Sequence, residues 1–421
     1  MNKKLHDYIF SIKAVDAHEH LLPEQDRLSI VPDVVWLFHQ YAISDLRSAG
    51  MSETDAQIIN DLSVPLNKRW QIFRPFYEFI RQTGYTKAVL CAIKDLYGFN
   101  DLNDRTYVAI SEEITRQNKP GITDCFLGKK GNIARILNCN YQYQQPVEYA
   151  HPIVNLNIIS MTKAKNDLHE LERRYKIKVD DLDSFLTMMA RIYQDYCKHN
   201  VIGVKTTVSP PAQTIDKRQA AKYFSKFLRG AFLADDAKAS LFSFLQDEAI
   251  KCASRADLTV AVHCGFLAGV NCDFTRTHVR YMVPLLLRHP EAHFDLFHLG
   301  YPWIEEAIAI AKSFSNASLN LCWCHAINPS AYERAIVEII NSVPSNKILA
   351  IGGDVWRLPD VAYGHLKLAR TGMARAFSNC VSDGRISFDE VRALAERWLN
   401  TNAFTIYPKL KLYALKTRKK S

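Results

Sequence analysis

The sequence lacks the segments that mark membrane, secreted and dinucleotide-binding proteins. It contains no run of about 18 apolar residues, so no segment is expected to span a membrane. The start of the sequence, Met1–Tyr8, lacks the apolar stretch of a secretory signal. No G-x-G-x-x-G motif follows an apolar strand, which argues against a dinucleotide-binding fold. These absences favour a cytoplasmic protein without a membrane partner.

Cysteine pairs with the spacing of zinc fingers or redox motifs are also missing. The ten cysteines are scattered along the chain, and none forms a C-x-x-C pair. Several of them lie in apolar runs, as is typical of buried free thiols in a reducing compartment.

The positive charge of the chain is concentrated at one end. The formal net charge is +9, but six basic residues lie between Lys409 and Lys420, so a basic tail at about 409–421 accounts for much of the excess. No basic face interleaved with aromatic residues is evident, so no nucleic-acid partner is expected. Hydrophobic residues make up 48% of the chain and charged residues 23%, which is typical of a globular protein with a substantial core.

Short apolar runs alternate with segments of helical periodicity, which predicts an α/β fold with a parallel sheet. The expected strands are 15–21, 133–137, 153–159, 201–208, 258–263, 293–298, 318–322 and 347–354. Eight strands favour a (β/α)8 TIM barrel, and residues 1–421 are expected to form one domain. An aromatic-rich helical insertion, about 23–119, follows the first strand; covering the barrel end and gating the substrate are both open roles for it.

The stretch Val15–Leu21 contains two histidines separated by one residue. Residues i and i+2 of a β-strand point to the same side, so His18 and His20 would present two imidazoles next to each other. Such a pair is suited to a divalent metal ion.

Four more candidate residues lie at the ends of other expected strands, which is where the active site of a TIM barrel is built. Lys205 lies on strand four, and His263, His298 and Asp354 end strands five, six and eight. Each histidine alone could be a hydrogen-bonded core residue, but a lysine within an apolar strand needs a partner. Neutral imidazoles and a carboxylate together suit Zn²⁺, with one position left open for water.

The roles expected within this set follow from its chemistry. A bound ion acidifies water, and Asp354 could both touch the ion and accept the water proton as general base. Arg357 could bind a substrate carboxylate in a bidentate manner, or form a surface ion pair beside Trp356. Tyr301 is expected in a loop at the site, and His325 is expected either to support a ligand or to contact substrate.

The order of these residues resembles the metal signature of the amidohydrolase superfamily. Phe297–Pro302, with the sequence FHLGYP, is similar to the His-x-Gly-x-Pro motif of the amidohydrolase 2 (amidohydrolase-related) group, and 321–325 and 343–354 resemble metal-dependent TIM-barrel hydrolases of that group. The helical block after strand one and the segment Trp398–Tyr407 are also similar to uronate isomerase. His298 departs from the isomerase pattern, and Lys205 departs from that of related decarboxylases.

The resemblance implies a metal-dependent hydrolase that acts on a carbonyl-type centre of a small polar substrate, with His18, His20, His263 and Asp354 as ligands of one Zn²⁺ ion. Lys205 and His298 would then face the substrate. If CO₂ carbamylates Lys205, the modified lysine would instead bridge two ions. A uronate isomerase-like or decarboxylase activity on a carboxylic or sugar acid is the alternative. The oligomeric state stays open, with a homo-oligomer among the options.

Overall fold

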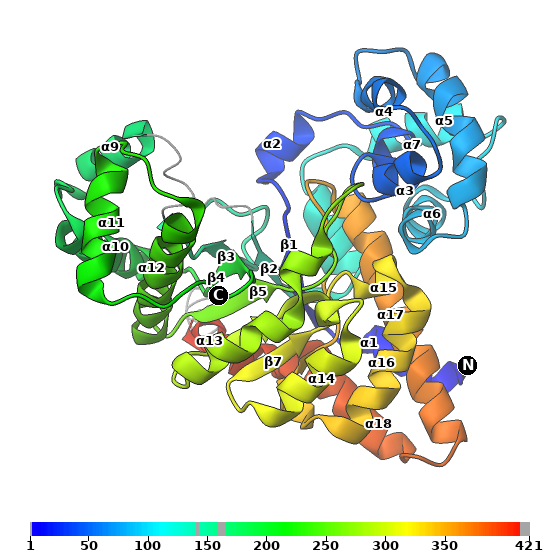
Figure 1. The fold of residues 1–421 in the computed structure, drawn as a ribbon. Helices are drawn as coiled ribbons and strands as arrows, with labels where there is room; N and C mark the ends of the chain where they lie inside the picture. The colour runs from blue at the N-terminus through cyan, green and yellow to red at the C-terminus, as the bar shows by residue number, and fades with distance from the viewer. Residues whose placement is uncertain (1, 140–142, 159–164, 413–421) are drawn as a thin grey trace.

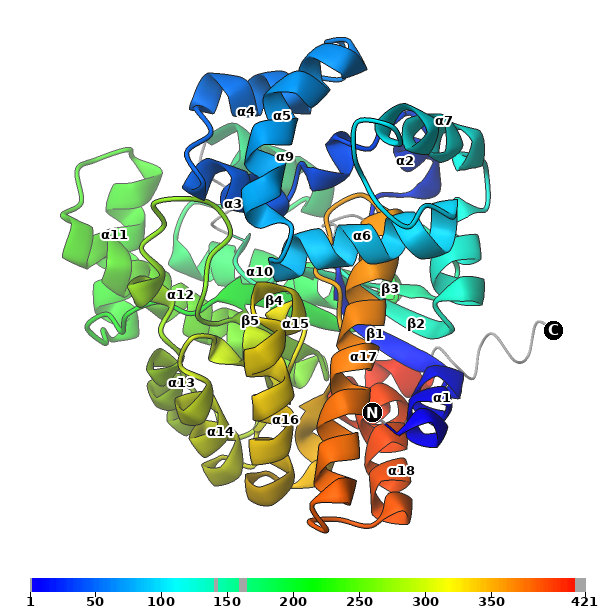
Figure 2. The same cartoon turned by 90° about the vertical axis from the view of Figure 1, so that its right-hand side faces the viewer.

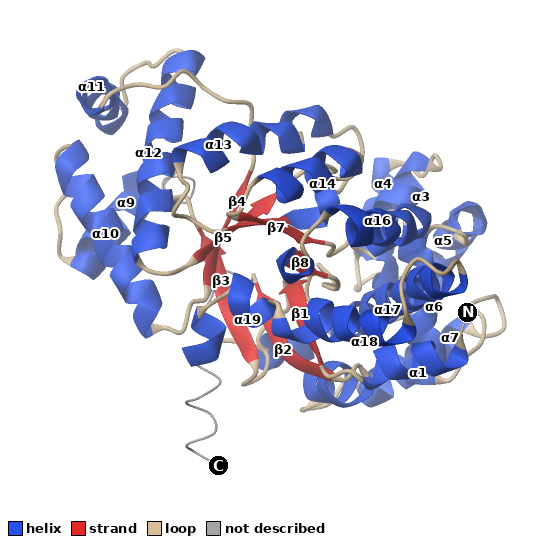
Figure 3. Cartoon of the chain, turned by 90° about the horizontal axis from the view of Figure 1, so that it is seen from below, coloured by secondary structure: helices blue, strands red, loops and turns tan. Residues whose placement is uncertain are grey.

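Eight parallel strands form a nearly closed barrel in the computed structural model, which describes residues 2–139, 143–158 and 165–412. The strands neighbour one another in sequence order, and red strands lie inside a ring of blue helices in Figure 3. They are β1 (Ala14–Glu19), β2 (Ile133–Asn138), β3 (Ala150–Asn155), β4 (Gly203–Thr207), β5 (Thr259–His263), β6 (Phe294–Leu296), β7 (Ala317–Asn320) and β8 (Ile348–Leu349). The expected (β/α)8 TIM barrel is confirmed.

Helices follow most strands and cover the barrel from outside (Figure 1). The helices between β3 and β5 lie together on one side of the barrel (Figure 1): α9 (Lys165–Tyr175), α10 (Leu182–Lys198), α11 (Lys217–Leu228) and α12 (Asp235–Arg255). The helices after β5 are α13 (Met282–Arg288), α14 (Ile304–Ser313), α15 (Cys324–Ile327), α16 (Pro329–Ser342), α17 (Pro359–Ser382) and α18 (Phe388–Glu396). Asp181 caps α10 as the sequence predicts, because its carboxylate accepts a hydrogen bond from the Ser184 amide.

A separate group of helices lies between β1 and β2 and rises above one side of the barrel (Figures 1 and 2). Its members are α2 (Glu24–Leu28), α3 (Ala42–Ser48), α4 (Glu53–Asn60), α5 (Leu66–Ile80), α6 (Gly84–Tyr97) and α7 (Tyr107–Gln117). Within this group α6 packs along α17, so the insertion is joined to the helix that follows β8.

The opposite end of the barrel is closed by α19 (Ala403–Ile406) and the residue after it. The Tyr407 ring lies in a buried apolar cluster with residues of β1, β2 and β3, and its hydroxyl donates to Asp295 Oδ2 at 2.7 Å. Gly203 is required here, because a Cβ on it would lie 2.9 Å from this ring. Residues 413–421 of the expected basic tail lie outside the described residues.

The observed bounds of several strands differ from the sequence prediction, among them those of β3, β6 and β8. β3 begins at Ala150, three residues early, because Pro152 still accepts a ladder hydrogen bond from the Ile202 amide. β6 ends at Leu296, so His298 lies in a turn beyond the strand. β8 ends at Leu349, although Ile351 still accepts a hydrogen bond from the Ala17 amide of β1.

In the described part of the chain, no helix has the length and apolar character needed to cross a membrane.

Candidate metal centre

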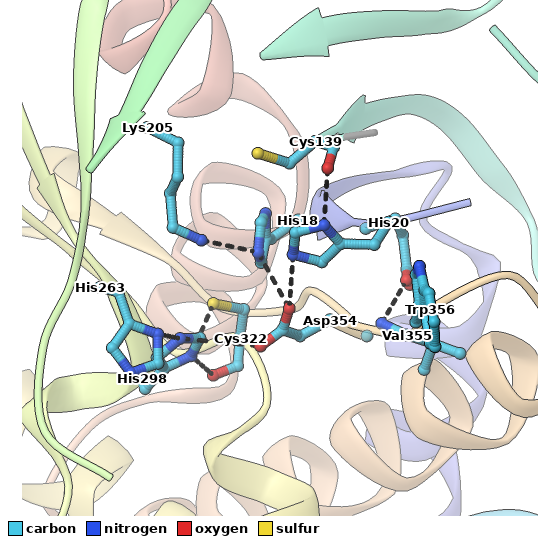
Figure 4. A network of polar contacts seen from close by, with 12 residues as sticks. His18, His20, Cys139, Lys205, His263, His298, Cys322, Asp354, Val355 and Trp356 are labelled. Atoms are coloured by element: carbon cyan, nitrogen blue, oxygen red, sulfur yellow. Dashed lines mark hydrogen bonds and ion pairs between the residues drawn. The ribbon is translucent and has the colours of Figure 1, made fainter. Parts of the chain in front are cut away.

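Three atoms that could bind one metal ion converge at the end of β1. Asp354 Oδ1 lies 3.0 Å from His18 Nε2 and 3.3 Å from His20 Nε2. One ligand atom from each of the three residues lies within 4.8 Å of the others (Figure 4). The expected pair of histidines, His18 and His20, therefore lies beside the expected carboxylate of Asp354, which is 336 positions after His18 in the chain.

The hydrogen bonds of the two histidines determine which ring nitrogen carries the proton. His20 Nδ1 lies 2.6 Å from the Cys139 carbonyl oxygen, and a carbonyl can only accept, so Nδ1 is the donor. Nε2 of a neutral His20 then presents a lone pair. His18 Nε2 lies 3.1 Å from Lys205 Nζ, which can only donate, so His18 Nε2 presents a lone pair as well.

The lone pairs of His18 Nε2 and His20 Nε2 thus point toward the Asp354 carboxylate, and no proton lies between His20 Nε2 and that carboxylate. Two neutral imidazole nitrogens and one carboxylate oxygen repel one another at these distances unless a cation lies among them. Nitrogen and oxygen donors of this kind suit Zn²⁺ and similar borderline cations, and three protein ligands leave a position open. The residues present therefore fit a bound divalent ion.

The backbone around Asp354 is adapted to this placement. Asp354 has a left-handed conformation with φ of 56°, and its amide donates to the His18 carbonyl at 2.8 Å. A Cβ on Gly352 would lie 2.9 Å from the His18 amide nitrogen, and one on Gly353 would overlap the Glu19 carboxylate. Only glycines therefore allow the chain to bring Asp354 this close to β1.

Two buried carboxyl groups lie beneath this turn. Glu19 Oε2 accepts the Val355 amide at 2.7 Å, and Asp16 Oδ1 is 3.4 Å from the Gly353 amide. Burial raises the pKa of Asp16 to about 7, and burial together with the neighbouring Asp16 raises the pKa of Glu19 well above its ordinary range. The pair is therefore held with at least one proton near neutral pH, which limits the negative charge behind the ligands.

Burial and neighbouring charges keep the histidines neutral and Asp354 ionised. Burial, with the Lys205 ammonium, lowers the pKa of His18 to about 3 and that of His263 to about 4. Burial, with neighbouring His263, lowers the pKa of His298 well below its usual value. Burial alone would raise the pKa of Asp354, but its contacts with the neighbouring imidazoles, His18 first among them, hold it well below its ordinary range.

Lys205 reaches the centre from β4, as the sequence predicts. It is nearly buried, and its ammonium lies against the Phe297 ring, 4.5 Å from the ring centroid. The partner that a buried lysine requires is His18 Nε2. Lys205 and a metal ion would therefore compete for the same lone pair of His18.

His263 and His298 form a pair beside the three converging ligands. His298 Nε2 lies 3.0 Å from His263 Nδ1 and 3.6 Å from Asp354 Oδ2. His298 is fully buried, and its conformation is left-handed with φ of 63°. The role of His263 as a ligand stays a prediction, since its Nδ1 faces His298.

The residues predicted to contact substrate lie in different surroundings. Arg357 lies over the exposed Trp356 ring, 3.6 Å from the ring centroid, and its Nε is buried without a partner among the described residues. Tyr301 packs on Phe266 beyond His298. His325 is buried in α15, with its ring 5.6 Å from that of His365. Arg357 and Trp356 therefore remain candidates for substrate contact, and His325 lies in helical packing.

Sequence reasoning missed three residues of the helical insertion that reach the centre. Tyr41 Oη donates to the Asp354 carbonyl oxygen at 2.6 Å. Gln40 Nε2 donates to the same oxygen, and Gln40 Oε1 accepts a hydrogen bond from the Trp356 amide. His39 stacks on Trp36, and its buried Nε2 has no partner in the described part of the chain. The only signal in the sequence is a polar and aromatic triplet, His39–Tyr41, directly after an apolar run.

Comparison with known proteins agrees with this fold. Residues 200–349 match the family model described as Amidohydrolase, which confirms over these residues the resemblance found in the sequence. Among curated proteins, no match to the chain was found.

Solved structures of similar shape cover almost the whole chain. A uronate isomerase from Thermotoga maritima is 15% identical, with a TM-score of 0.79 and 96% of each chain covered. A glucuronate isomerase from Caulobacter crescentus is 15% identical, with a TM-score of 0.77 and coverage of 96% of this chain and 93% of that one. A candidate metal-dependent hydrolase from Lactobacillus casei is 13% identical, with a TM-score of 0.66 and coverage of 97% and 98%. At these identities the likeness establishes the shared fold.

Proposed function

We propose that the protein is a metal-dependent hydrolase that acts on a small carboxylic acid, because residues 200–349 match the amidohydrolase family model and the described residues form a (β/α)8 barrel. The observation that carries this proposal is that His18 Nε2, His20 Nε2 and Asp354 Oδ1 converge on one point. Both nitrogens present lone pairs there, so no N–H group lies between them and the carboxylate oxygen. These three residues would hold the ion. A divalent cation such as Zn²⁺ would, when bound there, polarise a carbonyl oxygen and acidify a water.

Asp354 is the residue best placed to act as general base. Its carboxylate is held ionised among His18, His20 and His298, and its second oxygen, Oδ2, points toward His298. Oδ1 can contact the ion while Oδ2 accepts the proton of the attacking water. Since the backbone of Asp354 is fixed by the His18 and Tyr41 hydrogen bonds, the carboxylate is positioned before substrate binds.

Lys205 and Arg357 would orient the substrate. Lys205 comes from β4 on the His18 side, and with His18 as a ligand of a bound ion its ammonium would be free to donate to a substrate oxygen. Arg357 follows Asp354 in the turn after β8, its amide donates to the His20 carbonyl at 3.1 Å, and its Nε is buried without a partner among the described residues. A substrate carboxylate would satisfy that nitrogen and gain a planar, bidentate partner.

A second candidate function is isomerisation of a sugar acid. The observation that favours it is the extent of the structural likeness to two uronate isomerases, which includes the helical insertion between β1 and β2. Both candidate reactions need a metal ion, a base and a carboxylate-binding site. They differ in whether water is incorporated into the product.

The number of ions depends on the state of Lys205. We propose one ion with an unmodified lysine, which is supported by the contact of Lys205 Nζ with His18 Nε2. Carbamylation would place an anion there, and it would require added CO₂. Metal content measured with and without bicarbonate separates these states: one ion in both conditions supports the proposal, and two ions that depend on bicarbonate and Lys205 contradict it.

The experiment that tests the function is an activity screen of purified, zinc-loaded protein against N-acyl amino acids, lactones and uronates. Hydrolysis of an N-acyl compound or a lactone, lost in Asp354→Asn, supports the hydrolase. Interconversion of a uronate with its keto form supports the second candidate. Carrying out the reaction in H₂¹⁸O distinguishes them directly, because only hydrolysis places ¹⁸O in a newly formed carboxylate.

A further inference from the structure

A cavity of about 930 Å³ lies outside the candidate metal centre, between α12, α13 and the loop 209–213 that follows β4. The two helices lie next to each other on the outside of the barrel (Figure 3). The described residues that line the cavity include none of those at the metal centre. Small-molecule sites have volumes of about 300–1,000 Å³. The cavity is therefore large enough for a ligand of its own.

The wall of this cavity is mainly apolar. Met189 of α10, Leu245 and Ala249 of α12 and Leu285 of α13 line it, and all four are buried. Phe242 lines it as well, and 44% of this residue is exposed. An apolar ligand that covered the Phe242 ring would remove apolar surface from water, which favours binding.

Polar contacts across the elements hold the walls apart and in place. Gln246 Nε2 of α12 donates to Thr206 Oγ1 of β4 at 3.3 Å. Arg288 Nη2 of α13 lies 3.1 Å from Asp247 Oδ1 of α12. These contacts join α12 to the barrel on one side and to α13 on the other. The cavity is therefore formed before a ligand enters it, which lowers the free-energy cost of binding.

Three charged side chains line the cavity, and two of them are already compensated. Arg288 forms the ion pair with Asp247. Asp236 lies in the first turn of α12, where the N–H groups at the start of a helix favour a negative charge. Arg276 is exposed and has no ion pair with any described residue. The charge that remains for a ligand is therefore the positive charge of Arg276.

We propose that this cavity is a second ligand site, which binds a carboxylic acid with a long apolar chain. The carboxylate pairs with the Arg276 guanidinium, whose planar donors suit a carboxylate in a bidentate manner. The chain lies against Phe242 and Leu285, away from the metal centre. Since the lining is separate from that centre, this inference does not rest on the proposed function.

Calorimetric titration with octanoate and with 1-octanol tests the recognition of charge. We expect one octanoate per chain in the wild type. In Arg276→Gln the affinity for octanoate should fall roughly five-fold, because one charged partner is lost, while the affinity for 1-octanol should not change. Arg255→Gln is the matched control, since Arg255 is an exposed arginine at the end of α12 that does not line the cavity. Equal affinities for octanoate in Arg276→Gln and Arg255→Gln would overturn the proposal.

A variant that fills the cavity tests the location. Ser243 is a half-buried lining residue of α12, so Ser243→Trp places an indole in the cavity and should abolish binding of both ligands. Circular dichroism checks that the variant is folded, and the Arg276→Gln titration decides the matter if it is not. Unchanged octanoate binding in folded Ser243→Trp would place the ligand elsewhere and overturn the proposal. So would a wild type that binds no octanoate, as expected if another part of the chain or a second copy of it fills the cavity.

The metal-free protein separates this proposal from the proposed function. The double variant His18→Ala/His20→Ala should bind octanoate as tightly as the wild type, because neither histidine lines the cavity. Loss of binding in that variant would show that the carboxylate binds at the metal centre, which overturns the proposal. A wild type that binds octanoate but no zinc would contradict the proposed function and leave this site intact.

Discussion

Tyr41 Oη donates a hydrogen bond of 2.6 Å to the backbone carbonyl oxygen of Asp354. This contact joins the helical insertion to the turn after β8, 313 positions later, and it holds the carboxylate-bearing residue in its left-handed conformation. The insertion therefore contacts the candidate metal centre directly, so it does more than cover the barrel end.

Loss of this hydrogen bond should weaken metal binding. Tyr41→Phe removes one hydrogen bond, which is worth about 1 kcal/mol, so we expect zinc affinity to fall roughly five-fold while the fold is retained. Zinc titration with a competing chelator measures this. Tyr85→Phe is the matched control, because Tyr85 stacks on Tyr41 with 5.3 Å between ring centroids but does not bond to Asp354. An equal loss in both variants would show that the hydrogen bond to Asp354 is not the cause.

Removal of the basicity of Asp354 should abolish most of the activity. Asp354→Asn keeps the size of the side chain but cannot accept a proton, so kcat should fall on the order of 10² or more. Zinc content must be measured in the same preparation, since Asp354 is also a proposed ligand. Near-normal kcat in a zinc-loaded variant would exclude Asp354 as the general base.

Arg357 should determine the preference for acidic substrates. Arg357→Lys keeps the positive charge but loses the planar pair of donors, so KM for a carboxylate substrate should rise with little change in kcat. The control is the same comparison with an uncharged amide or ester of that substrate, for which KM should not change. Identical KM values of the two proteins for the carboxylate would show that Arg357 does not bind it.

Much of this arrangement follows from the sequence, because it depends on local periodicity. The same-side placement of His18 and His20 follows from strand alternation, and the approach of Asp354 to β1 is anticipated by Gly352 and Gly353. The sequence does not show where His298 lies, because its left-handed turn is imposed by tertiary packing.

Contacts between distant segments could not be predicted from the sequence. The bond from Tyr41 to Asp354 and the contact of Cys322 with His298 depend on how the insertion and the β7 loop pack on the barrel. Neither residue has a local signature, since a tyrosine in a helical segment and a cysteine in an apolar run are both usual core residues.

A buried carboxyl on β6 should make the stability of the protein depend on pH. Burial raises the pKa of Asp295 to about 7, despite the hydrogen bonds that it accepts from Asn320 and Tyr407. Between about pH 4 and about pH 7 the folded protein therefore keeps a proton that the unfolded chain releases, so the contribution of Asp295 to the free energy of unfolding falls as pH rises through this window.

Denaturant unfolding of wild type and Asp295→Asn at pH 5 and pH 8 tests this effect. The difference between the two proteins isolates Asp295 from other titrating groups. We expect the wild type to lose stability relative to the variant on going from pH 5 to pH 8, by up to about 3 kcal/mol. A difference that stays constant with pH, or one of opposite sign, would contradict the raised pKa.

The most direct test of the centre is the zinc content of the purified protein, measured by elemental analysis beside the double variant His18→Ala/His20→Ala. The structure predicts about one ion per chain in the wild type and nearly none in the double variant, because two of the three converging electron pairs are removed. His289→Ala is a suitable control, since His289 is buried beside Asp247 on another element. Equal zinc content in the wild type and the double variant would contradict the proposed metal centre.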